Sequence, residues 1–272
     1  VRRQRQMCIR DSTSTSTSNG NGNGLVDDDV DDYLKQLDDQ LKNAVHINEN
    51  DNGKGNEKVM AFVEAQKMNP NYVNSKEFRL MFLRMYSDCG CNTDPTTQQN
   101  NTNNRTTYDV NKATDKLLLH FQIKKQIFGN VGNVLGRDVR LSDLDNNDRI
   151  AMNSGAFQIM PERDTAGRAI ILYAPGQRIY NKIENWMKAM WYLMYVVAKD
   201  IDNQLMGICI VVYFRGFTTV RDTFEQAQKV TLVRDAIPNK IVALHYCYQD
   251  ESMIALITAQ KVHFLTRNLR SR

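Results

Sequence analysis

The histidines and cysteines are the residues of this sequence that could bind a metal ion. His120 and His263 lie in helix-like segments, and neither has a second ligand at the spacing that a metal site requires. Cys89 and Cys91 form a single pair in a polar stretch, whereas a zinc site needs two further Cys or His ligands nearby. We therefore expect no bound metal and no cofactor.

The sequence does not indicate a catalytic hydrolase site either. Such a site needs a serine on a Gly-flanked turn between a strand and a helix, with a histidine and an acid in reach. Ser154 is followed by glycine but precedes the first expected strand. His245 falls inside an apolar run, which favours a hydrogen-bonded core histidine. Residues 129–136 contain three glycines but lack the Gly-Lys-Ser/Thr of a nucleotide loop. We expect a protein without enzymatic activity.

A row of methionines is the candidate for ligand binding. Met187, Met190, Met194 and Val197 recur at helical spacing, so they share one face of a helix. Methionine is flexible and polarisable, which suits a wall that contacts irregular apolar ligands. The same periodicity is typical of a helix that simply packs on a sheet. From the residues alone, both interpretations stay open.

The second half of the chain has the pattern of alternating strands and helices. Residues 169–174, 206–214 and 241–247 are short, apolar and rich in β-branched side chains, which predicts three strands. Residues 181–199 and 219–234 have a helical period and lie between them. Strands that are apolar at nearly every position are typically covered on both faces, and the intervening lengths suit βαβ crossovers. The fold class expected is α/β, with a mostly parallel sheet flanked by helices.

The first half is predicted to be helical. Residues 25–45 form an acidic amphipathic pattern, and residues 57–68 form a second helical pattern. Ser75 is the expected N-cap of a third helix, and Asp109 that of a longer fourth. Residues 87–107 are rich in Asn, Thr and Gln and are interpreted as a polar loop.

Composition places the chain among ordinary globular proteins. The net charge of +4 comes from four arginines in residues 1–10, which leave 31 basic against 31 acidic residues after them. Nucleic-acid binding therefore loses its main support. Five scattered cysteines indicate a reducing compartment. No apolar run reaches the roughly 18–20 residues that a membrane span requires.

The predicted organisation separates a tail from the folded part. The first residues resemble a translated adaptor sequence and are followed by Ser/Thr and Asn/Gly repeats, which cannot build a core. The expected divisions are a disordered or artefactual tail over residues 1–24, an acidic helix and linker over 25–56, a helical N-terminal unit over 57–136, and an α/β domain over 137–272.

Four blocks of the sequence resemble, in the same order, motifs of the CRAL-TRIO lipid-binding domain family. The first block, residues 76–84 (KEFRLMFLR) with residues 108–113 (YDVNKA), is similar to helical motifs of the family's N-terminal unit. The other blocks are similar to its strand motifs: residues 158–170 (QIMPERDTAGRAI), 207–217 (GICIVVYFRGF) and 238–245 (PNKIVALH). Tyr213 stands where the family has an acid, and the chain ends where the family's next strand would begin, so we expect a C-terminally incomplete domain.

The resemblance implies an apolar cavity between the strand floor and a movable gate helix. Ile208, Ile210 and Val212 alternate along one face of the central strand, and the resemblance places that face toward the cavity. The residues that would line the cavity are Met187, Met190, Met194, Ile208, Ile210, Val212, Leu232 and Ile237. Residues 252–265 correspond to the gate helix, where Ile254 and Ile257 would face the ligand.

The function implied is the binding and transfer of a small lipophilic ligand, such as a phospholipid or a tocopherol- or retinoid-like molecule, between membranes. The expected partners are that ligand and, transiently, a membrane surface, with no nucleic acid. The expected location is cytoplasmic, with peripheral contact with membranes. The alternative is a regulatory scaffold with the same fold and a filled core, which binds a protein partner.

Overall fold

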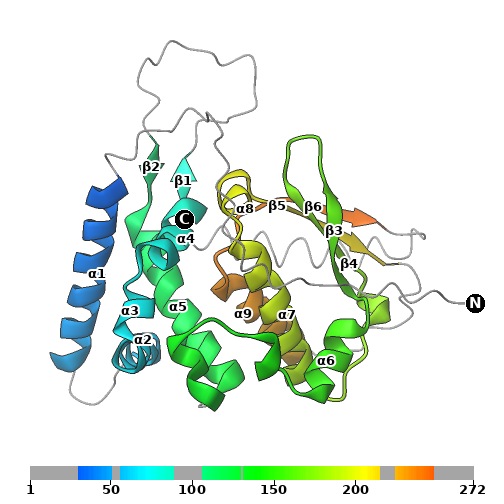
Figure 1. Ribbon diagram of the computed structural model, residues 1–272, viewed down its shortest axis with the longest axis horizontal. Coiled ribbons are helices and arrows are strands. Elements are labelled where there is room, and N and C mark those ends of the chain that lie inside the picture. Colours follow the sequence, from blue (N-terminus) through cyan, green and yellow to red (C-terminus); the bar gives the residue numbers. More distant parts are fainter. Residues whose placement is uncertain (1–29, 51–55, 89–105, 130, 215–223, 248–272) are drawn as a thin grey trace, which may run out of the picture.

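The computed structural model describes residues 30–50, 56–88, 106–129, 131–214 and 224–247. In the described part, the N-terminal helices lie together on the left of Figure 1, where α2 and α1 both pack against α5. They are α1 (Val30–Asn50), α2 (Glu57–Met68), α3 (Pro70–Val73), α4 (Lys76–Met85) and α5 (Val110–Phe128). α1 therefore continues five residues beyond the predicted end at residue 45, into the segment expected to be a linker.

The predicted caps define where two of these helices begin. The Ser75 side chain accepts a hydrogen bond from the backbone N–H of Phe78, and the Asp109 side chain accepts one from the backbone N–H of Lys112. Each bond satisfies a backbone donor that the first turn of a helix leaves without a partner. The polar loop predicted over residues 87–107 is bounded by β1 (Ser87–Asp88) and β2 (Thr107–Tyr108), which pair antiparallel.

The second half forms an α/β unit with a mixed sheet, which confirms the predicted fold class. Its four strands lie in the order β3-β4-β5-β6. β3 pairs antiparallel with β4, whereas β4, β5 and β6 run parallel. The strands are β3 (Phe157–Arg163), β4 (Ala169–Tyr173), β5 (Ile208–Tyr213) and β6 (Ile241–Cys247), and the helices are α6 (Asn146–Asn153), α7 (Ile183–Ala198), α8 (Ile201–Met206) and α9 (Phe224–Ala236).

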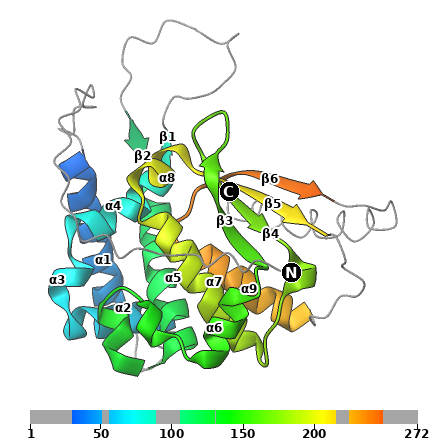
Figure 2. The ribbon, with the colours of Figure 1, turned by 45° about the vertical axis from the view of Figure 1, so that its right-hand side comes forward.

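The crossover helices share one side of the sheet. α7 connects β4 to β5 and α9 connects β5 to β6, so both belong to parallel crossovers in the same direction across the sheet. Such crossovers are almost always right-handed, which places successive helices on the same face. Figures 1 and 2 show α7 and α9 side by side between the sheet and α5. The crossovers thus place α7 against the sheet, whose strands were predicted to form the floor of the ligand site.

β3 was not among the three apolar runs, and its composition explains why. The strand contains Gln158, Pro161 and Glu162, and its second half is exposed. β3 lies at one end of the strand order, where a proline without an N–H is tolerated. The strands were predicted from runs of consecutive apolar residues. An edge strand does not need such a run, so β3 was not predicted.

The expectation that all strands would be covered on both faces was wrong for β6. Its residues are half-buried or exposed, and His245 is exposed, so the prediction of a core histidine at this position is corrected. β6 lies at the other end of the described strand order. An apolar sequence therefore identified the strand but did not report how much of its surface is covered.

Buried side chains from both halves form one hydrophobic cluster that extends from α1 to the sheet. Its largest fully buried members include Trp186 and Trp191 of α7 and Phe121 of α5. The ring of Trp186 stacks on that of Tyr173 in β4, at a centroid distance of 6.1 Å. α7 therefore contacts the sheet on one side and the N-terminal helices on the other.

The backbone at Gly207 approaches β6 so closely that a side chain does not fit there. Gly207 ends α8 with a φ of +77°, and an added Cβ would lie 2.5 Å from Val242 Cγ1 and 2.8 Å from the Lys240 carbonyl oxygen. Gly207→Ala should therefore lower the free energy of unfolding by about 2–4 kcal/mol, from the unfavourable φ and the steric overlap together. Chemical denaturation of both proteins measures this difference.

Gly167 provides the matched control, because its φ is also +77° but an added Cβ would meet nothing within 4 Å. Gly167→Ala should therefore lower the free energy of unfolding by about 1 kcal/mol, from the unfavourable φ alone. If the two variants lost the same free energy of unfolding, the close approach of Gly207 to β6 would be contradicted.

Candidate functional site

The predicted methionines all lie in the interior. Met187, Met190 and Met194 are 9%, 5% and 1% exposed, respectively. Met187 and Met190 lie between Trp186, which contacts β4, and Trp191, which contacts α5, and Met194 lies three residues beyond Trp191. The helical period that predicted a shared apolar face therefore corresponds to side chains enclosed between the sheet and the N-terminal helices.

The β5 residues of the predicted site point to the same interior. Ile208, Ile210 and Val212 are buried, and the parallel register places Ile210 beside Ile171 of β4, which is also fully buried. On the opposite face Val211 and Tyr213 are only partly buried, whereas Cys209 is buried but does not belong to the hydrophobic cluster. The alternation predicted from the sequence thus matches the membership of the cluster, and it matches the observed burial at every position except Cys209.

Two further predicted residues lie at the α9 end of this interior. Ile237, directly after α9, is fully buried, and Leu232 within α9 is half-buried and packs against the core. The structure thus gathers the eight predicted lining residues into and against one hydrophobic cluster. The predicted gate residues Ile254 and Ile257 lie outside the described residues.

A cleft opens onto this cluster where α5, α7 and α9 meet. It has a volume of about 210 Å³, and its lining residues are Ile123, Gln126, Ile127, Glu184, Met187, Lys229 and Leu232. Of the predicted site residues, Met187 and Leu232 line it, and the other six do not. Sites for drug-sized ligands have volumes of roughly 300–1,000 Å³. In the conformation observed, the cleft can therefore admit only part of a lipid.

A larger cleft, of about 360 Å³, lies at a distance from these residues, between α1, α2 and α4. Its buried polar group is Arg79, which forms an ion pair with Asp38 of α1 and donates hydrogen bonds to the Val73 carbonyl oxygen and to Asn74. Because these contacts attach α1 to α4, we assign this cleft to the packing of α1 and not to a ligand.

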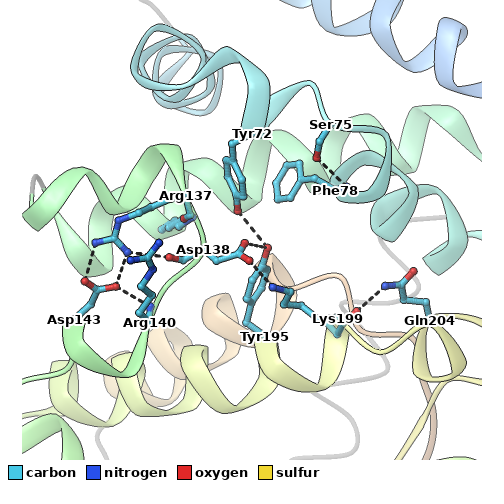
Figure 3. A network of polar contacts seen from close by, with 12 residues as sticks. Tyr72, Ser75, Phe78, Arg137, Asp138, Arg140, Asp143, Tyr195, Lys199 and Gln204 are labelled. Carbon is cyan, nitrogen blue, oxygen red and sulfur yellow. Dashed lines mark hydrogen bonds and ion pairs between the residues drawn. The ribbon is translucent and has the colours of Figure 1, made fainter. Parts of the chain in front are cut away.

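The structure also reveals a polar network at the junction of the two halves, which sequence analysis did not identify (Figure 3). Tyr195 of α7 donates a hydrogen bond to Asp138 (2.9 Å), and Lys199 donates another to the same carboxylate (2.5 Å). The Tyr72 hydroxyl lies 3.2 Å from that of Tyr195. Because the Tyr195 proton is directed to Asp138, Tyr72 must donate to Tyr195. The network joins α3, the segment before α6 and the end of α7.

The pKa values of these groups suit a structural link. Burial raises the pKa of both Tyr72 and Tyr195 well above its ordinary value, so both remain neutral hydrogen-bond donors. Burial alone would raise the pKa of Asp138, but the hydrogen bond and charge of Lys199 and the tyrosine hydroxyls lower it overall. A negative Asp138 thus accepts hydrogen bonds from Tyr195 and Lys199, and neither tyrosine hydroxyl is activated as a nucleophile.

Three basic residues occupy the buried side of α5 next to this network. Lys116, His120 and Lys124 are spaced by four residues, which places them along one side of the helix. Burial lowers the pKa of Lys124 to about 7 and that of Lys116 to about 8, and it lowers the pKa of His120 well below its ordinary value. The sequence contains a signal for this row. Lys116, His120 and Lys124 recur every four residues, so they lie on the same side of the helix as the apolar residues Leu117 and Phe121.

His120 occupies an aromatic environment within this row. Its ring lies 4.9 Å from that of Trp191 and 5.4 Å from that of Phe82. Its Nδ1 lies 3.2 Å from the carbonyl oxygen of Ala236 and must donate the proton, because a carbonyl only accepts. Its Nε2 has no hydrogen-bond partner in the part of the chain that the structure describes. His120 therefore ties α5 to the end of α9 as a neutral side chain.

A scan against models of known protein families found no match to this sequence. Among the described residues, no three or more His, Cys, Asp or Glu side chains are grouped so that they could hold a metal ion. None of the described helices has the length and apolar character needed to cross a membrane. The apolar interior and its cleft are therefore the features of the described residues that bear on function.

Proposed function

We propose that this protein binds a small lipophilic molecule in its α/β unit and transfers it between membranes without covalent chemistry. The ligand would be a phospholipid or a tocopherol- or retinoid-like molecule, as the resemblance to CRAL-TRIO domains implies. The observation that carries the proposal is the position of the methionine row of α7. It shares an interior with the apolar face of β5 and begins at a cleft lined by Met187 and Leu232.

The physical basis of binding is the burial of apolar surface. Transfer of apolar surface out of water contributes roughly 25 cal/mol per Å². Methionine side chains change rotamer at little energetic cost and can line an irregular ligand. Met187, Met190 and Met194 would therefore move aside to extend the cleft toward β5. The helix predicted over residues 252–265 is the proposed gate, and the protein would act in the cytoplasm with transient contact with membrane surfaces.

A scaffold with a filled core is the second candidate, and one observation favours it. Met194, Ile208 and Ile237 are at most 1% exposed and belong to the same cluster as Trp186 and Trp191. These side chains fill the interior themselves in the conformation observed. In this alternative, the fold would present a surface to a protein partner and would take up no lipid.

Met190→Trp distinguishes the two candidates. If the interior opens for a ligand, the larger ring should occupy that space, abolish lipid uptake from liposomes and leave thermal stability nearly unchanged. If the core is filled, the same change should overpack it and lower the free energy of unfolding by about 1–3 kcal/mol. Lipid content is measured by mass spectrometry and stability by chemical denaturation.

Met206→Trp is the matched control, because Met206 is 47% exposed at the end of α8. This variant should keep both lipid uptake and stability. A destabilised Met190→Trp protein, together with a wild-type chain that takes up no lipid, would support the scaffold in place of lipid transfer.

A further inference from the structure

We propose that the groove that α1 occupies on α2, α4 and α5 is a docking site for an acidic amphipathic helix of a protein partner, and that α1 competes with this partner for it. The groove belongs to the N-terminal helices, and Figure 1 shows α1 on the side of the molecule away from the sheet. The inference therefore goes beyond the proposed lipid site and does not depend on it.

The helix α1 itself shows what kind of helix the groove accepts. Val30, Leu37 and Leu41 are its buried side chains among the residues whose burial is described. The ring of Tyr33 packs edge-on against that of Tyr108, just before α5, at a centroid distance of 5.0 Å. An amphipathic helix docks in a groove with such an apolar stripe inward. The groove thus already holds a helix with the apolar face that the inference requires.

Two cations of α4 pair with two acids of α1 that are seven residues apart. The Lys76 Nζ lies 2.6 Å from the Asp31 carboxylate, and Arg79 forms an ion pair with Asp38. Residues seven apart lie on the same side of a helix, so both acids lie beside the stripe that contains Leu37. A basic side chain at either position would be repelled by α4. The charges on the page therefore select an acidic helix.

Arg79 is held in place by groups outside α1. Its Nε donates a hydrogen bond to the Val73 carbonyl oxygen at 3.2 Å, and its Nη2 donates one to Asn74 at 2.7 Å. Its Nη1 contacts Asp38 of α1. Arg79 is 7% exposed, and a buried guanidinium that loses its acid partner destabilises the structure. Arg79 is therefore a preformed receptor for one carboxylate of a docked helix.

The second half of α1 does not fill the groove. The cleft of about 360 Å³ lies there, with Leu41 and Val45 of α1 on one side and Phe62 of α2 on the other. Val45 is only partly buried, and Ile47 is 68% exposed. A partner helix with larger apolar side chains at these positions would bury more apolar surface than α1 does and would bind more tightly. Such a helix could therefore displace α1.

The position of α1 in the chain allows its release. It precedes the other described elements, so its departure interrupts none of them. A helix that is tethered to its own docking site competes at an effective concentration on the order of millimolar. α1 would thus exclude weakly binding helices and yield to strongly binding ones, which makes it an autoinhibitory element.

Fluorescence anisotropy with a labelled peptide of residues 30–50 tests the inference on the full chain. Leu37→Asp in the chain should release its own α1 and leave the groove intact, so the peptide should bind this variant at least tenfold more tightly than the wild type. In the peptide, Asp38→Asn should weaken binding to this variant at least tenfold. Asp39→Asn is the matched control in the peptide, because Asp39 is exposed, and it should change binding less than twofold.

A second chain variant keeps the test valid if Leu37→Asp disturbs folding. Asp38→Asn in the chain is the milder change, and it should strengthen binding of the unmodified peptide by about three- to tenfold. Equal binding to the wild type and both variants, or equal effects of the two peptide changes, would overturn the inference. If both chain variants lose the near-ultraviolet circular dichroism of Trp186 and Trp191, α1 is an integral part of the core and the inference is wrong.

A designed peptide tests whether the groove recognises the chemistry of a helix and not only the sequence of α1. It keeps the contact residues Val30, Asp31, Leu37, Asp38 and Leu41 and has alanine or glutamine elsewhere. It should bind the Leu37→Asp chain within tenfold of the α1 peptide, and failure to bind would overturn docking of a partner. A wild-type dimer in light scattering that Leu37→Asp abolishes would also overturn it, because the second copy would then supply the helix.

Discussion

Trp191→Ala should lower the free energy of unfolding by about 3–5 kcal/mol, the range typical of deleting a fully buried large aromatic side chain. Trp191 is fully buried, and its ring lies 4.9 Å from that of His120 and 6.1 Å from that of Phe128, both on α5. It therefore connects α7 to the N-terminal helices. Small domains are stable by only about 5–15 kcal/mol, so this loss should be visible as a large shift of the denaturation midpoint.

Val196→Ala on the same helix is the control, because Val196 is 38% exposed. It should change stability by no more than about 0.5 kcal/mol, as is usual for surface positions. A loss below about 1 kcal/mol for Trp191→Ala, equal to that of the control, would mean that α7 is not held between the two halves as described.

Lys124→Met should make the protein more stable near pH 7, by about 1–3 kcal/mol after the loss of one hydrogen bond. Lys124 is 1% exposed and donates a hydrogen bond to the Arg137 carbonyl oxygen at 2.5 Å, and its ammonium lies 5.2 Å from the centre of the Tyr72 ring. Desolvation of the ammonium outweighs the attraction of Asp138 and lowers the pKa to about 7. Methionine has a similar shape and no charge to desolvate.

The pH dependence of this difference is the decisive signature. In the unfolded chain Lys124 has its ordinary pKa of 10.5, whereas in the folded chain the pKa is about 7. Between these values the unfolded state binds the extra proton, so raising the pH stabilises the wild type. The advantage of Lys124→Met should therefore shrink by up to about 1.4 kcal/mol per pH unit between pH 7.5 and pH 9.5.

Urea denaturation of both proteins across this pH range provides the measurement. Lys125→Met is the control, because Lys125 is partly exposed and pairs with Glu64 on the protein surface. The free energy of unfolding of Lys125→Met should stay within about 0.5 kcal/mol of the wild-type value. A constant difference between Lys124→Met and the wild type over these pH values would show that Lys124 is not buried as a costly charge.

Local signals in the sequence predicted much of this fold. The apolar runs located β4, β5 and β6 to within two residues of their observed ends, because short runs of apolar and β-branched residues are typical of strands. The side chains of Ser75 and Asp109 located two helix starts, because capping depends on a hydrogen bond within the same turn. β3 and α8 were missed, because an edge strand and a six-residue helix carry weak periodic signals.

The sequence predicted which side chains of the candidate site share a face of a strand or helix, but it did not predict how those faces pack together. Strand alternation identified Ile208, Ile210 and Val212 as neighbours, because side chains in a strand repeat every two residues. The available space depends on how side chains from α5, α7 and α9 interlock, which no local pattern records. The polar network could not be predicted for the same reason, because the hydroxyls of Tyr72 and Tyr195 are in contact although the two residues are 123 positions apart in the sequence.

Lipid uptake by the wild-type chain tests the central proposal most directly. The purified protein is incubated with liposomes that contain phosphatidylcholine, tocopherol and retinol, separated by gel filtration and extracted for quantitative mass spectrometry. Lipid transfer predicts close to one lipid molecule per chain, and loss of that lipid in Met190→Trp. A folded wild-type protein that emerges without stoichiometric lipid would contradict the proposal.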